Sequence, residues 1–208
     1  MVAIVDYDAG NTKSVQKAFA HLGAETMLTR EPEKILRADR VVLPGVGAFG
    51  DAMGKLERFG LVDVLREAAA SGKPFLGICL GLQLLFERSE ESPGVSGLGL
   101  FKGESRHFTE KEGYKIPQIG WNSLHLKGDG RLFAGLSEGT FVYFVHSYYV
   151  HAEDRSIVKA SCAYTDEADA SIEAGNVFAC QFHPEKSGAA GLSLLKVFMG
   201  DAKGGCGC

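Results

Sequence analysis

The chain has 208 residues, 45% of them hydrophobic and 23% charged, with a net charge of −4. These values are typical of one globular α/β domain with a sizeable core. The absence of a basic stripe argues against a nucleic-acid partner, and no apolar stretch approaches the roughly 20 residues of a membrane-spanning helix. The N-terminus lacks a signal-peptide pattern. Five scattered cysteines favour a reducing, cytoplasmic environment over a disulfide scaffold.

The first ninety residues alternate short apolar runs with amphipathic segments, as repeated β-α units do. The strands expected from the apolar runs are residues 2–6, 25–29, 40–43 and 74–78. The helices expected from the periodic segments are residues 11–22, 51–59 and 61–71. Because crossover helices bury such strands on both faces, we expect an α/β fold whose central sheet is mainly parallel and flanked by helices.

The pattern changes after about residue 97, where short strand-like runs are separated by turn residues. Residues 141–145, 157–162 and 177–181 are expected to be antiparallel additions along the same sheet. A helix over residues 187–199 closes the fold. We therefore predict one domain over residues 1–202, followed by a flexible, glycine-rich tail at 203–208.

Cys79 comes directly after the expected strand 74–78 and stands between Gly77 and Gly81. In the sequence of a nucleophile elbow, a strand is followed by the nucleophile and then by the start of a helix. Glycines stand two positions before and two positions after the nucleophile. Amide groups at the helix start favour a thiolate, and the Leu80 N–H can donate to a developing oxyanion. The alternative is that Cys79 is a small buried hydrophobic residue.

A second pattern lies near the C-terminus, where His183 and Glu185 are separated by Pro184. Proline favours an extended conformation at the residue before it, so residues 183 and 185 can project to the same side. A carboxylate beside the imidazole would fix its tautomer and support its protonated form. Together with Cys79, this pattern predicts a Cys-His-Glu triad.

A glycine-rich loop, residues 43–50, follows the expected strand 40–43. Sites in parallel α/β sheets form beyond the carboxyl ends of strands, so we expect this loop near the elbow. Backbone N–H groups of Val46 and Gly47 could form the second half of an oxyanion hole with Leu80. The spacing does not match a dinucleotide-binding fingerprint, and a plain turn is the simpler alternative.

The segments at residues 77–83 and 181–185 resemble the two signatures of the class I glutamine amidotransferases. This resemblance implies a flavodoxin-like fold and a triad that hydrolyses the side-chain amide of glutamine and releases ammonia. Gln83 and Gly45 would then help to hold the substrate. Neither a metal nor an organic cofactor is expected, because a thiolate and an oxyanion hole supply the catalysis.

Four further segments, at residues 6–11, 44–47, 117–122 and 143–149, look like those of the glutaminase subunits of imidazole glycerol phosphate synthases. The likeness runs from about residue 1 to residue 200. It implies that Ser147 and Tyr148 bind the α-groups of glutamine through their backbone. It also implies that Asn11, Trp121 and Asn122 lie toward a cyclase subunit in a heterodimer.

The expected reaction delivers ammonia to that cyclase, which makes imidazole glycerol phosphate and an aminoimidazole carboxamide ribotide in histidine biosynthesis. Two alternatives stay open from the residues alone. One is a class I glutaminase that serves another acceptor, as in pyridoxal phosphate synthesis. The other is a sensor or chaperone on the same scaffold with a reactive cysteine but no amidotransferase activity.

Overall fold

A computed structural model describes residues 1–200 of the chain, so the tail predicted at 203–208 lies outside the described residues. The α-helices are α1 (Thr12–His21), α2 (Pro32–Arg37), α3 (Phe49–Arg58), α4 (Val62–Ala70), α5 (Leu80–Gln83) and α6 (Gly188–Phe198). Three 3-10 helices are η1 (Arg131–Phe133), η2 (Arg155–Ile157) and η3 (Pro184–Lys186).

The strands of the first half are β1 (Val2–Val5), β2 (Thr26–Thr29), β3 (Arg40–Gly45), β4 (Phe75–Cys79), β5 (Phe86–Ser89) and β6 (Phe101–His107). Those of the second half are β7 (Gln118–Ser123), β8 (His125–Leu126), β9 (Phe141–His146), β10 (Tyr148–Ala152), β11 (Val158–Ala163), β12 (Glu167–Ala174) and β13 (Val177–Cys180). The elements expected in the first eighty residues are all present, and α2 is an addition that the sequence did not predict.

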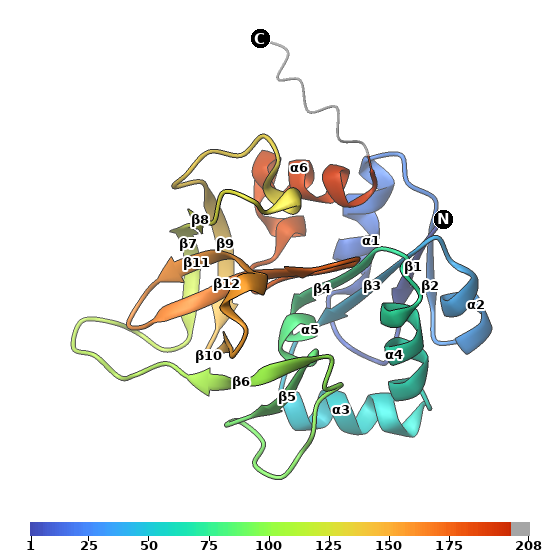
Figure 1. Ribbon diagram of the computed structural model, residues 1–208, viewed down its shortest axis with the longest axis horizontal. Helices are drawn as coiled ribbons and strands as arrows, with labels where there is room; N and C mark the ends of the chain where they lie inside the picture. The colour runs from blue at the N-terminus through green and yellow to red at the C-terminus, as the bar shows by residue number, and fades with distance from the viewer. Residues whose placement is uncertain (201–208) are drawn as a thin grey trace.

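The main sheet has the strand order β2-β1-β3-β4-β13-β12-β10-β6-β5 (Figure 1). Its first five strands are parallel, whereas β12, β10 and β6 join them through antiparallel pairs. Strands β11 and β8 extend the sheet from β12, and β7 pairs with β9 in a separate two-stranded sheet. The α/β fold with a mainly parallel central sheet and antiparallel additions is thus confirmed.

The parallel strands alternate their side chains between two hydrophobic cores. Along β3, Val41 and Leu43 pack into the core on the side of α2, α3 and α4, whereas Val42 packs into the core on the side of α1 and α6. In β4, Phe75 belongs to the first core, and Leu76 to the second. Burial on both faces explains why these strands are continuously apolar rather than alternating in sequence.

Two of the three predicted antiparallel additions were wrong. The run at 177–181 forms β13, the last of the five parallel strands, which pairs in parallel with β4 on one side and antiparallel with β12 on the other. All four β13 residues are buried, as in a central strand. The run at 141–145 forms β9, which pairs with β7 outside the main sheet. Only the run at 157–162, seen as β11, is an antiparallel addition, next to β12.

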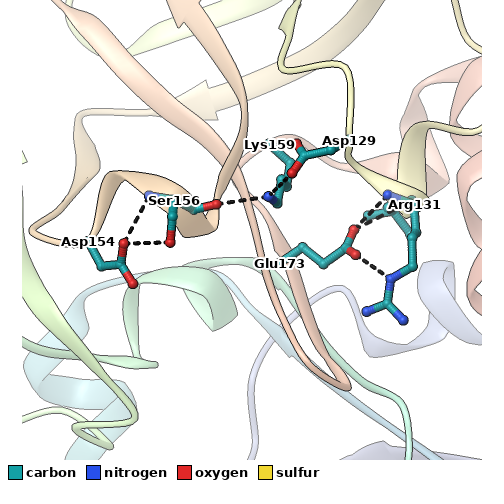
Figure 2. Close-up of polar contacts among 7 residues, drawn as sticks. Asp129, Arg131, Asp154, Ser156, Lys159 and Glu173 are labelled. Carbon is teal, nitrogen blue, oxygen red and sulfur yellow. Dashed lines mark hydrogen bonds and ion pairs between the residues drawn. The ribbon is translucent and has the colours of Figure 1, made fainter.

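A polar network ties the segment that contains η1 to β11 and β12 (Figure 2). The buried Glu173 carboxylate accepts the Arg131 backbone N–H at 2.8 Å and pairs with the Arg131 guanidinium. The Lys159 ammonium donates to Asp129 at 2.7 Å and to the Ser156 carbonyl at 2.8 Å. These contacts hold η1 in place, so that its apolar residues close the core beneath α6.

Three parallel strands end at one edge of the sheet, and this edge carries the predicted site residues. Gly45 at the end of β3 is the register partner of Cys79 at the end of β4. Cys180, at the end of β13, pairs with Ile78, so the chain leaves β13 toward His183 at the same level. Within residues 1–200, no helix is both long and apolar enough to cross a membrane.

Candidate active site

Cys79 occupies a strained turn between β4 and α5. Its φ of 57° and ψ of −111° lie in a region that non-glycine residues rarely adopt. The turn is so tight that a Cβ atom on Gly81 would lie 1.9 Å from the Leu43 carbonyl oxygen, and one on Gly77 would lie 2.8 Å from the Gly81 oxygen. The two glycines therefore permit the elbow, and the helix that follows, α5, is a single turn.

His183 and Glu185 form a buried pair behind the cysteine. The Nδ1 atom of His183 lies 2.7 Å from Oε1 of Glu185, and the Asn11 amide donates to the same carboxylate oxygen at 2.5 Å. Burial on its own lowers the pKa of His183, but its interactions with Cys79 and Glu185 outweigh burial and raise the pKa to about 9. Burial disfavours the Glu185 carboxylate, yet the contacts with His183 and Asn11 hold its pKa below the usual value.

The second imidazole nitrogen is the one available to the nucleophile. His183 Nε2 is buried and has no hydrogen-bond partner of ordinary length among residues 1–200. Cys79 nevertheless lies close enough to raise the pKa of the imidazole. Catalytic hydrogen bonds are often long before substrate binds, so a small side-chain rotation can close the Cys79–His183 pair. The structure thus brings together all three residues of the predicted triad.

A cavity of about 420 Å³ opens over the cysteine. Its wall includes seven residues predicted for the oxyanion hole, the nucleophile or glutamine binding: Val46, Gly47, Cys79, Leu80, Gln83, Ser147 and Tyr148. Five lining residues were not predicted, namely Glu91, Pro117, Val145, His146 and Lys186. Since Cys79 is only 6% exposed, a substrate reaches its sulfur through this cavity.

The two predicted loop glycines are required for different reasons. A Cβ atom on Gly45 would lie 2.7 Å from the Tyr7 hydroxyl and 2.9 Å from the Leu80 Cβ, so Gly45 is needed for space. The Tyr7 hydroxyl itself donates to the Pro44 carbonyl at 2.9 Å and holds the start of the loop. Gly47 has free space around it but a φ of 97°, so it is needed for backbone conformation.

Gln83 is buried in the cavity wall. Its Nε2 atom donates to the Tyr148 carbonyl at 3.0 Å and to Oε1 of Gln181 at 3.1 Å. The side-chain N–H groups of Gln83 are therefore committed to the protein. Its Oε1 atom has no hydrogen bond to the described part of the chain, so this atom is the one that Gln83 can offer to a ligand.

Glu91 and His146 are the polar lining residues that sequence reasoning missed. The Oε2 atom of Glu91 accepts the Phe49 N–H at 2.7 Å, which turns a carboxylate toward the cavity. His146 donates from Nδ1 to the Tyr148 carbonyl at 2.9 Å, and burial lowers its pKa to about 4. Glu91 has no local sequence signal, because the folding of distant segments brings it to the cavity, whereas His146 directly precedes the predicted Ser147.

The three residues predicted to face a partner have different surroundings. Trp121 is 54% exposed and stands on β7, with its ring 6.2 Å from that of Tyr143 on β9. The Asn122 amide donates to the Ala163 carbonyl at 2.9 Å. Asn11 is engaged with Glu185 and so also contacts the triad. Among residues 1–200, no group of three or more histidine, cysteine or acidic side chains is arranged to hold a metal ion.

The family model for class I glutamine amidotransferases, "Glutamine amidotransferase class-I", matches residues 3–201. The chain is 52% identical over 200 residues to the imidazole glycerol phosphate synthase subunit HisH of Bacillus cereus (strain G9842), covering 96% of this chain and 94% of the relative. The HisH subunit of Streptococcus sanguinis (strain SK36) is 48% identical over 198 residues, covering 95% of each chain. The chain belongs to the class I glutamine amidotransferases, among the HisH subunits.

Structural comparison shows that this amidotransferase shares its fold with solved structures of low sequence identity. A crystal structure of a glutamine amidotransferase superposes with a TM-score of 0.74 at 19% identity, covering 97% of this chain and 98% of the other. The glutaminase domain of Trypanosoma brucei CTPS with bound acivicin superposes with a TM-score of 0.65 at 17% identity, covering 96% and 93%. The resemblance expected from residues 77–83 and 181–185 is confirmed by the family match over residues 3–201.

Proposed function

We propose that Cys79, His183 and Glu185 hydrolyse glutamine to glutamate and ammonia. The ammonia then passes to a cyclase subunit, which makes imidazole glycerol phosphate and aminoimidazole carboxamide ribotide in histidine biosynthesis. One observation carries the proposal: Cys79, on a strained elbow, lines a cavity of about 420 Å³, and a buried His183–Glu185 pair lies behind it.

The cavity offers groups that complement each part of glutamine. The substrate amide carbonyl faces the N–H groups of Leu80 and of Val46 or Gly47, which become the oxyanion hole. The Glu91 carboxylate suits the α-ammonium group, and the Gln83 Oε1 atom can accept a further N–H from the substrate. Backbone groups of Ser147 and Tyr148 bind the remaining α-group atoms. Gly45 contributes by keeping the loop close to Leu80.

In the first half of the reaction, the Cys79 thiolate attacks the amide carbon and a tetrahedral oxyanion forms. The imidazolium of His183 gives its Nε2 proton to the leaving nitrogen, so the carbon–nitrogen bond breaks and ammonia departs. A glutamyl thioester and a neutral imidazole remain. Glu185, at 2.7 Å from Nδ1, orients the ring and stabilises its charged form.

In the second half, His183 Nε2 takes a proton from water, and the resulting hydroxide attacks the thioester carbonyl. The carbon–sulfur bond breaks, glutamate leaves, and the thiolate–imidazolium pair is restored. The net reaction consumes one glutamine and one water and yields one glutamate and one ammonia. The raised pKa of His183, about 9, supports this cycle because the imidazole is protonated at neutral pH when the thiolate is present.

The cyclase docks, in this proposal, on the outer face of the β7–β9 sheet. Ile119, Trp121 and Phe141 are each more than half exposed there, an unusual loss of burial for large apolar side chains. This face is continuous with the cavity, because Val145 lines the cavity and is the register partner of Ile119. A partner seated on it would therefore cover the route by which ammonia leaves Cys79.

The decisive experiment is Cys79→Ala in the complex with the cyclase. Glutamine-driven synthesis should disappear, while synthesis driven by added ammonium salt should stay at the wild-type rate. A mutant complex that still used glutamine would contradict the triad assignment. If the protein were instead a reactive-cysteine sensor, Cys79→Ala would abolish only alkylation of the thiol. The wild-type protein would then release no ammonia from glutamine, even with the cyclase present.

A further inference from the structure

We propose that Gln181 is a further catalytic residue, whose side-chain amide donates an N–H to the Cys79 sulfur and connects this sulfur to the substrate-binding Gln83. The proposal rests on Cys79 as the nucleophile of the function proposed above. Its basis is a continuous chain of hydrogen bonds from the cavity wall to the reacting atom, in which Gln181 is the last link.

Gln181 is completely buried and directly follows the last residue of β13. Its backbone N–H donates to the Ala170 carbonyl at 2.9 Å, which fixes the residue against β12. The side chain then runs between two residues of the site. Its Nε2 atom lies 3.8 Å from the Cys79 sulfur, and its Oε1 atom accepts from Gln83 at 3.1 Å.

The direction of each hydrogen bond in the chain follows from chemistry. A backbone carbonyl can only accept, so the Gln83 group 3.0 Å from the Tyr148 oxygen must be its NH₂. The same Gln83 nitrogen also faces Gln181, which must therefore present its oxygen. The NH₂ of Gln181 is left pointing at the Cys79 sulfur. Flipping either amide would put oxygen against oxygen or N–H against N–H.

An N–H aimed at sulfur affects the two charge states of the cysteine differently. A thiol sulfur is a weak acceptor, whereas a thiolate is a full negative charge and binds a donor much more strongly. At 3.8 Å the contact is long for a thiol and can tighten on ionisation. A donor that is already oriented and buried costs no reorganisation when the charge forms, so Gln181 stabilises the nucleophilic form.

The chain also couples substrate binding to the nucleophile. When the Gln83 Oε1 atom accepts a donor from bound glutamine, the Gln83 amide becomes more polarised and a better donor to Gln181. Gln181 in turn becomes a better donor to Cys79, because hydrogen bonds in series strengthen one another in a low-dielectric interior. Occupation of the cavity therefore favours the thiolate at the moment it is needed.

A second buried glutamine–cysteine pair in the molecule provides a matched control. The Gln118 amide lies 3.9 Å from the Cys162 sulfur, nearly the same distance, but Cys162 does not line the cavity. The Gln118 Oε1 atom is buried without a partner among the described residues, so no chain continues from it. Burial raises the pKa of Cys162 to about 11 despite the amide contact.

The test compares Gln181→Met with Gln118→Met in the complex with the cyclase. Methionine has a similar length and removes both ends of the amide. For Gln181→Met we expect kcat for glutamine to fall roughly 10- to 100-fold. We also expect the rate of Cys79 alkylation by iodoacetamide to rise only at higher pH than in the wild type. For Gln118→Met, kcat and the alkylation profile of Cys79 should stay at wild-type values.

A wild-type kcat and alkylation profile in Gln181→Met would overturn the proposal. So would an equal shift in Gln118→Met, because the effect would then come from lost packing. If Gln181→Met does not fold, Gln181→Glu keeps an acceptor for Gln83 but replaces the donor with a carboxylate whose negative charge opposes the thiolate, so the same two changes are expected with larger size. Alkylation of Cys79 is measured without glutamine, so the two proposals can fail separately. A wild-type complex that does not hydrolyse glutamine would refute the proposed function. The pH profile of Cys79 alkylation would still test the role of Gln181.

Discussion

Asn11 and Glu185 are joined by a hydrogen bond of 2.5 Å, in which the Asn11 amide donates to the same carboxylate oxygen that faces His183. The two residues are 174 positions apart in sequence. Asn11 has a φ of 73°, a left-handed conformation that asparagine tolerates better than most residues. The loop after β1 therefore reaches the triad and holds its carboxylate beside the imidazole, with the Asn11 amide nitrogen 3.4 Å from His183 Nδ1.

Removal of this amide should slow catalysis without weakening substrate binding. Asn11→Gly keeps the left-handed backbone and deletes only the side chain, so we expect kcat for glutamine to fall about 5- to 10-fold at unchanged KM. Asn11→Asp also tolerates the backbone but places a second carboxylate beside Glu185, and its loss should be larger. Steady-state kinetics of the complex measures both, and a wild-type kcat in both variants would show that the Asn11 amide does not support the triad.

The raised pKa of His183 predicts how activity depends on pH. Activity should fall as pH rises through about 9, where the imidazolium loses the proton it gives to ammonia. Glu185→Gln removes a charge that favours the imidazolium, so the pKa of His183 and the alkaline limb of the profile should move to lower pH, with roughly 100-fold lower kcat. NMR titration of His183 checks the direction of the pKa change. If the alkaline limb of the activity profile stayed at the same pH in Glu185→Gln, deprotonation of the imidazolium could not be its cause.

The same ion pair contributes to stability with a definite sign. The pKa of His183 is above its ordinary value of 6.5, so protonation stabilises the folded state. The contribution is present in full below about pH 6.5 and is lost as pH rises to about 9. Urea unfolding of the wild type and Glu185→Gln should therefore differ more at pH 6 than at pH 10.

Two glycine-to-alanine variants should have opposite effects on stability. Gly81→Ala places a Cβ 1.9 Å from the Leu43 oxygen, a backbone atom of the adjacent strand, so we expect the free energy of unfolding to fall by about 4 kcal/mol, or the protein not to fold. Gly54→Ala, inside α3 with free space around it, should stabilise the fold by about 0.5–1 kcal/mol. Chemical denaturation measures both, and a soluble, active Gly81→Ala protein would contradict the close approach at the elbow.

The outer face of the β7–β9 sheet should be needed for partner binding but not for folding. Trp121→Ala removes an exposed ring, so the midpoint of thermal unfolding should hardly change, whereas affinity for the cyclase should fall at least about 10-fold. Arg37→Ala serves as the control because Arg37 ends α2, on the far side of the molecule from β7 (Figure 1). Calorimetric titration compares the two, and equal affinities would exclude this face as the docking site.

The local chemistry of the site is readable from the chain itself. The Gly77–Cys79–Gly81 spacing defines a turn that only small flanking residues permit. His183 is extended before Pro184, as predicted, but Glu185 reaches its imidazole from the 3-10 helix η3 and not from the extended segment that the sequence led us to expect. Both patterns involve residues a few positions apart, so backbone sterics decide them before the rest of the chain folds. The continuously apolar runs of β1, β3 and β4 likewise predicted a parallel sheet correctly.

Only the tertiary structure decided which distant residues meet. The pairing of Gly45 with Cys79, the insertion of Gln181 between Gln83 and the sulfur, and the separate sheet formed by β9 all depend on strand register. Register depends on which hydrophobic faces and turns meet across the whole sheet, so a short motif does not fix it on its own. Cys79, His183 and Glu185 could therefore be recognised in the sequence, whereas the residues that position them became visible only once the strands were paired.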